Sequence, residues 1–213
     1  MSNYEEFKNM LQQYFEDKGI SFPIETTLRD SSENDHDKNE LPVYLYTGEK
    51  NLPVISMDAV AQIGYKKSKE APNGSSHNVN TADAFLIDAD KEWYFIEFKD
   101  CKISSKKDNI EKKGMANWLM LMDIFEHMEA DRCSDIVDVN NLMQFARDHI
   151  TYIVVCNSEK DPYTYEHVRS CDILKERYTP ECLYKFKDFF FKDAYAYTEQ
   201  FFEQKFVKNF VFE

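Results

Sequence analysis

The sequence predicts an α/β protein whose central sheet lies between helices. Residues 82–87 and 93–99 are short runs rich in β-branched and aromatic side chains, which is typical of strands. Both faces of this strand pair are apolar apart from a few charges. Segments with apolar residues at helical spacing precede and follow the pair. A sheet that is apolar on both faces must be covered on both sides, so we expect helices to pack against it.

The bulk properties predict one folded domain, residues 1–213. Hydrophobic residues make up 43% of the chain, with 17 Phe and 13 Tyr, which is enough to form a substantial core. No apolar stretch approaches the roughly 20 residues of a membrane span, and the N-terminus lacks the pattern of a signal peptide. The five cysteines are scattered, as is typical of reduced thiols. We therefore expect a cytoplasmic protein without membrane contact.

The first part of the chain predicts a helix, a loop and two short strands. Apolar residues at helical spacing indicate a helix over 3–18, which Gly19 ends. The charged stretch 29–40 is expected to form an exposed loop. Residues 42–47 and 53–56 have the composition of strands.

The remaining elements surround the strand pair. Ser56 is suited to cap a helix that starts at Met57. The full set of further expectations is a helix over 57–67, a loop over 69–78, a helix over about 108–130, a buried strand over 149–157, and a mostly helical, aromatic-rich tail over about 161–213.

The strand pair gathers three charged residues in one plausible register. If the polar residues 88–92 form the loop of a hairpin, Asp83 falls directly opposite Glu97 on the neighbouring strand. Lys99 shares their face because side chains alternate along a strand. A loop one residue shorter would put the two acids on opposite faces. From spacing alone, a structural ion pair and a metal-binding cluster remain equally open.

These residues resemble the signature of a known family. Asp83, a hairpin and then Glu97-Phe98-Lys99 is similar to the motif of the PD-(D/E)xK nuclease superfamily, which includes the restriction endonucleases. Ala82 stands where the family name has proline. The resemblance implies a restriction-endonuclease-like core of helix, three strands, helix and strand at about 41–157, followed by a helical C-terminal extension. It also implies a metal-dependent nuclease that hydrolyses phosphodiester bonds, with DNA favoured over RNA.

The resemblance also implies roles for particular residues. Asp83 and Glu97, together with the backbone carbonyl of Phe98, would bind Mg²⁺ or Mn²⁺, since Mg²⁺ prefers oxygen ligands. Lys99 would orient the attacking water and stabilise the charge that develops on the phosphate. Many members add an acid from a helix, and the candidates here are Asp58 and Glu70.

Charge limits how the protein could contact nucleic acid. The net charge of −13 argues against binding through the whole surface, but it allows a local basic patch. Such a patch is predicted just after the second strand, at Lys102, Lys106, Lys107 and Lys113. A solvated loop and helix face is the alternative interpretation of these lysines. A catalytically inactive relative that binds a protein partner is the alternative function, and a homodimer remains open.

Overall fold

The computed structural model describes residues 2–34, 41–69, 78–128 and 136–212. Within these residues it shows a mixed six-stranded sheet in which spatial order follows chain order. The second, third and fourth strands are each antiparallel to the one before, whereas the fifth runs parallel to the fourth and the sixth parallel to the fifth. The strands are β1 (Glu25–Thr27), β2 (Pro53–Ser56), β3 (Ala84–Ile87), β4 (Trp93–Lys99), β5 (Ile150–Cys156) and β6 (Asp193–Thr198).

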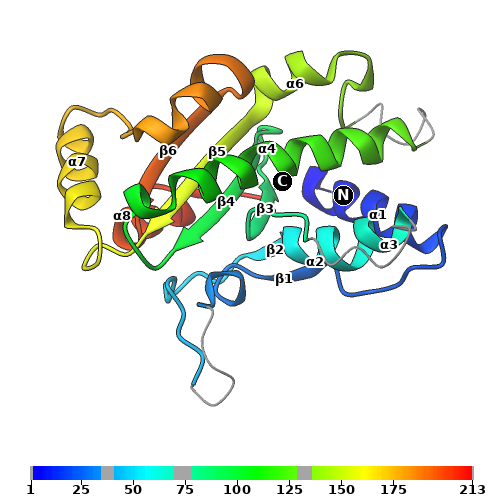
Figure 1. Cartoon of the computed structure of the whole chain (residues 1–213), viewed down its shortest axis with the longest axis horizontal. Helices are drawn as coiled ribbons and strands as arrows, with labels where there is room; N and C mark the ends of the chain where they lie inside the picture. Colours follow the sequence, from blue (N-terminus) through cyan, green and yellow to red (C-terminus); the bar gives the residue numbers. More distant parts are fainter. Residues whose placement is uncertain (1, 35–40, 70–77, 129–135, 213) are drawn as a thin grey trace.

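Helices lie between and beside these strands. The longest helix, α4, lies in the connection between β4 and β5 and crosses the sheet in Figure 1. A π-helical segment, Val60–Tyr65, joins two short α-helical turns after β2. The α-helices are α1 (Asn3–Glu16), α2 (Met57–Ala59), α3 (Lys66–Ser68), α4 (Lys107–Glu126), α6 (Leu142–His149), α7 (Pro162–Ile173) and α8 (Glu199–Lys205). None of the helices in the described ranges is long and apolar enough to cross a membrane.

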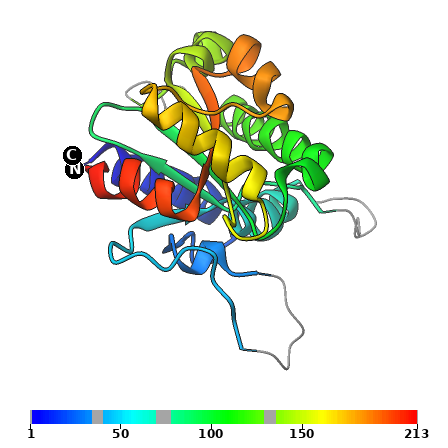
Figure 2. The same ribbon diagram turned by 90° about the vertical axis from the view of Figure 1, so that its left-hand side faces the viewer.

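Alternate residues of β4 face two different helical layers. Trp93 contacts Phe7 of α1, at 4.7 Å between ring centroids, and also lies against α4 and α6. On the opposite face, Phe98 contacts Phe202 of α8. Figure 2 shows α4 and α8 on opposite sides of the strands. The predicted mixed α/β architecture, with a sheet between helices, is therefore confirmed.

Several predicted elements are correct within a few residues. Helix α1 ends near Gly19, whose φ of +74° suits glycine. The Ser56 hydroxyl accepts a hydrogen bond from the Ala59 N–H, which is the predicted cap. Strand β4 has the predicted bounds. Helix α4 ends at Glu126 instead of at about residue 130, and β5 is one residue shorter than expected at each end. The loop predicted at 69–78 lies almost entirely outside the described residues.

Other expectations were wrong. Residues 42–47 form no strand, and Tyr44 makes only an isolated bridge with Glu33. The tail is not simply a helical extension, because β6 lies within it and pairs with β5. Strand β1 and helix α6 were not predicted. The last residues return to the start of the chain, where Phe212 contacts Tyr4 at 5.2 Å between ring centroids, and both termini are close together in Figures 1 and 2.

Candidate active site

The hairpin has the register that the sequence predicts. Phe85 lies opposite Phe95 and Ala84 opposite Ile96, and the Asp83 N–H donates a hydrogen bond of 3.0 Å to the Ile96 carbonyl. Asp83 therefore continues the ladder and falls beside Glu97. Lys99 forms an ion pair with Glu97 from the same strand. The three predicted residues thus come together in space.

A second lysine joins the cluster from helix α4. The Lys113 ammonium lies 3.0 Å from Asp83 Oδ1 and 2.9 Å from Glu97 Oε1, so it bridges the two acids. The other Asp83 oxygen, Oδ2, accepts a 2.6 Å hydrogen bond from the Phe98 N–H. The sequence placed Lys113 in a surface patch, whereas its side chain is only 14% exposed and lies inside the site.

Asp58, one of the two helix-borne candidates, also lies at the site. It belongs to α2, and its Oδ1 accepts a 2.8 Å hydrogen bond from the buried Thr81 hydroxyl. Burial raises the Asp58 pKa, and its charge interacts with those of Asp83 and Lys113. Glu70, the other candidate, lies outside the described residues.

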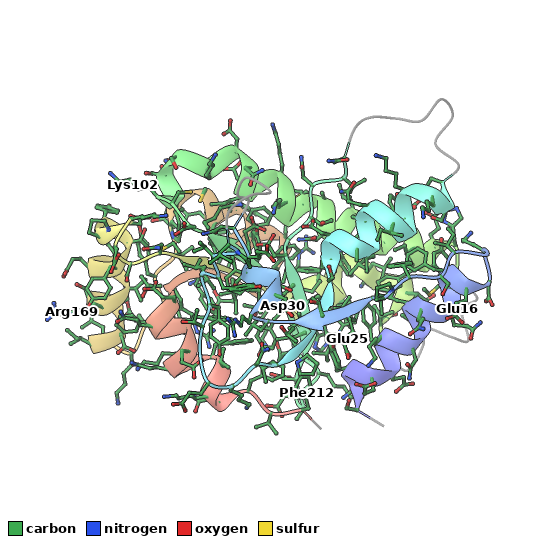
Figure 3. All side chains as sticks on the ribbon, turned by 90° about the horizontal axis from the view of Figure 1, so that it is seen from below. Glu16, Glu25, Asp30, Lys102, Arg169 and Phe212 are labelled. Carbon is green, nitrogen blue, oxygen red and sulfur yellow. The ribbon has the colours of Figure 1, made fainter. Side chains whose placement is uncertain are left out.

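These groups line or underlie an open pocket of about 390 Å³. Its polar lining contains more acids than lysines, so it favours cations. Glu97 is fully buried beneath the lining, and the lysines that contact it are exposed to the pocket. Figure 3 labels Asp30, a lining residue, near the middle of the molecule seen from below. The lining residues are Thr26, Asp30, Ser31, Glu33, Asn34, Ser56, Asp58, Asp83, Phe98, Lys99, Asp100 and Lys113.

Burial dominates the electrostatics of the cluster. It raises the pKa of Glu97 to about 8, repulsion from Asp83 adds to the effect, and Lys113 and Lys99 oppose it. Burial alone would lower the Lys113 pKa, but the two acids raise it above its usual value. The positive charges of Lys99 and Lys113 therefore offset the repulsion between two closely spaced carboxyl groups, of which that of Glu97 is inaccessible to solvent.

Two residues of α4 fix the position of this helix against the sheet. A Cβ atom on Gly114 would lie 2.7 Å from Phe186 and 2.8 Å from Tyr152, so the absence of a side chain lets α4 approach closely. The Asn117 Oδ1 accepts a 2.9 Å hydrogen bond from the Ala82 N–H, next to Asp83. Sequence reasoning missed both residues, although their spacing of three places them on one helix face.

The remaining lysines of the predicted basic patch stay on the surface. Lys102 and Lys106 are exposed beside the end of β4, and Figure 3 labels Lys102 near the start of α4. Lys107 is exposed and forms an ion pair of 2.8 Å with Glu181. The structure therefore separates Lys113 from the other three lysines.

The next question is whether the carboxylates of the site suit a divalent ion. In the described ranges, no three His, Cys, Asp or Glu residues are gathered closely enough to hold a metal. Mg²⁺, however, commonly uses one or two carboxylates and keeps several waters. Glu97 Oε2 is buried and makes no hydrogen bond with the described residues. One cation, the Lys113 ammonium, already bridges Asp83 Oδ1 and Glu97 Oε1, so this pair of carboxylate oxygens also fits a divalent cation.

Comparisons with models of protein families, with curated proteins and with solved structures found no match to this chain.

Proposed function

We propose that this protein is a metal-dependent nuclease of the PD-(D/E)xK type, which hydrolyses phosphodiester bonds with DNA favoured over RNA. One observation carries the proposal. Asp83, Glu97 and Lys99 converge from adjacent antiparallel strands beside an open, acid-rich pocket, together with Asp58 from a helix. A fully buried acid, Glu97, beside a second acid that lines a pocket is a combination more common at functional sites than in a purely structural core.

Each residue has a role that its chemistry permits. Asp83 and Glu97, with the Phe98 carbonyl, would hold Mg²⁺ or Mn²⁺. A bound ion of this kind acidifies water and offsets charge on the phosphate. Lys99 lines the pocket and pairs with Glu97, and its ammonium would orient a phosphate oxygen or an attacking water. Asp58 adds a further carboxylate to the lining of the pocket.

Substrate contact would be local because the protein as a whole is acidic. Lys102 and Lys106 are exposed and follow Lys99 by three and seven residues in the chain. Their ammonium groups would contact phosphates, which position a backbone without specifying its sequence. Binding should therefore weaken as the salt concentration rises.

The test is cleavage of single-stranded, double-stranded and branched DNA and of RNA, with Mg²⁺, Mn²⁺, Ca²⁺ or a chelator. Wild type should cut at least one substrate with Mg²⁺ or Mn²⁺ only. Asp83→Asn should remove metal binding and cleavage, whereas Lys99→Ala should remove most cleavage and retain metal binding. Asp108→Asn and Lys208→Ala, at exposed positions away from the pocket, are the matched controls and should retain both activities.

Two results would overturn the assignment. Undiminished cleavage in Lys99→Ala would indicate another site or a contaminating enzyme. Normal metal binding without cleavage of any substrate would instead favour a catalytically inactive relative that binds a protein partner.

A further inference from the structure

Lys113 occupies an unusual position in the cluster. Its ammonium contacts one oxygen of Asp83 and one of Glu97, at 3.0 and 2.9 Å. Among the residues that the structure describes, Lys99 pairs with Glu97 alone, and it comes from the same strand. Lys113 therefore lies between the two carboxylates that are proposed to hold the metal.

A divalent ion and the Lys113 ammonium cannot share this place. Mg²⁺ binds carboxylate oxygens at about 2.0–2.1 Å. An ion held by both Asp83 Oδ1 and Glu97 Oε1 would therefore occupy the space in which the ammonium now lies. Two cations at such a separation repel strongly where solvent is largely excluded. Entry of the metal therefore requires Lys113 to leave at least one of its two partners.

The fold allows this movement through the side chain alone. Helix α4 is held against the sheet at Gly114 and by the Asn117 bond to Ala82, both within the first turn after Lys113. The lysine side chain is long and flexible, and Lys113 already lines the open pocket. Its ammonium can therefore turn toward the pocket while α4 stays in place.

We infer that Lys113 is a built-in counterion that competes with the metal for Asp83 and Glu97, so that metal binds only when the Lys113 ammonium leaves the pair. This inference rests on the proposed function. Without metal, Lys113 stabilises two carboxylates that would otherwise repel each other. With metal, the ammonium is released into the pocket, where a substrate phosphate would lie.

The test is calorimetric titration of Mn²⁺ and Mg²⁺ into wild type, Lys113→Met and Lys112→Met at fixed ionic strength. Lys113→Met keeps most of the side-chain stem but removes the competing charge. It should bind metal at least about tenfold more tightly, since each charge-assisted hydrogen bond contributes on the order of one such factor. Lys112→Met makes the same change in net charge at an exposed neighbour and should bind like wild type.

Equal or weaker metal binding by Lys113→Met would overturn the inference and leave the proposed function standing. If neither wild type nor either variant binds metal, both proposals fail. A lysine that only supports the fold would lower the melting temperature of Lys113→Met without tightening metal binding.

A second measurement uses the wild-type chain, in case Lys113→Met does not fold. Brief acetylation followed by mass spectrometry reports the accessibility of each lysine. Adding Mn²⁺ should increase acetylation of Lys113 and leave that of Lys112 unchanged. Reactivity of Lys113 that stays constant at saturating Mn²⁺ would contradict displacement of the ammonium.

Discussion

Replacing Glu97 by Gln should change how the stability of the protein depends on pH. Glu97 is fully buried, and its pKa is raised to about 8 in the folded state, first by burial and then by Asp83. The folded protein therefore holds the Glu97 proton more tightly than the unfolded chain does. Stability from this group is fully present below the unfolded pKa and is lost as the pH rises through 8.

The size of the effect follows from the two pKa values. The ordinary glutamate pKa of 4.5 and the folded value of about 8 differ by several units, and each unit corresponds to about 1.4 kcal/mol. Between pH 5 and pH 9, most of that difference is expressed. The free energy of unfolding of wild type should therefore fall by about 4 kcal/mol relative to that of Glu97→Gln across this interval, because glutamine does not titrate.

Urea denaturation at pH 5, 6, 7, 8 and 9 in the presence of a chelator measures this difference. The free energy of unfolding of wild type minus that of Glu97→Gln should fall steadily with pH and level off above pH 8. All other titrating groups are common to both proteins, so their contributions largely cancel. Glu126→Gln, at the exposed end of α4, is the control. A difference between wild type and Glu97→Gln that stays constant from pH 5 to 9 would refute the reasoning.

Three further predictions test the surroundings of the site. Gly114→Ala should lower the free energy of unfolding by about 1–3 kcal/mol, measured by urea denaturation, because the new methyl group overlaps Phe186; unchanged stability would show that α4 can shift freely. Asn117→Ala should also lower the free energy of unfolding by about 1–3 kcal/mol, since the buried Ala82 N–H loses its acceptor. Thermal melting measures this change. Mg²⁺ at 100 times its Kd should raise the stability of wild type by about 2.7 kcal/mol in the same melts, and an equal rise in Asp83→Asn would remove this cluster as the binding site.

Local patterns were enough to predict the central hairpin. Its register depends on the loop at 88–92 and on the alternation of apolar residues, and both are visible in a short stretch of sequence. Strand β6 was missed because its residues lie in an aromatic-rich tail whose apolar residues have mostly helical spacing. Its strand conformation comes from pairing with β5, about forty residues earlier in the chain. Strand β1 was missed for a similar reason, since only three residues pair with β2.

The difference between local patterns and long-range packing also decides which residues of the candidate site could be predicted. Asp83, Glu97 and Lys99 could be predicted together because strand geometry relates them directly. Lys113 could not, since its place depends on how α4 packs across the sheet. The sequence shows Lys113 only as one of several lysines at the start of a helix. Its partners become visible once Gly114 and Asn117 fix the distance and rotation of α4.

Burial of Glu97 affects the pH at which the site can bind metal. Burial raises the pKa of the Glu97 carboxyl group, so a metal ion that binds there competes with a proton. Lys113 supplies part of the positive charge beside Glu97 without metal, and a divalent ion would supply more. Metal binding should therefore release protons and strengthen from pH 6 to pH 9. Titrations in buffers of different ionisation enthalpy measure the released protons, and metal affinity that is the same at both ends of this range would contradict a role for Glu97 as a ligand.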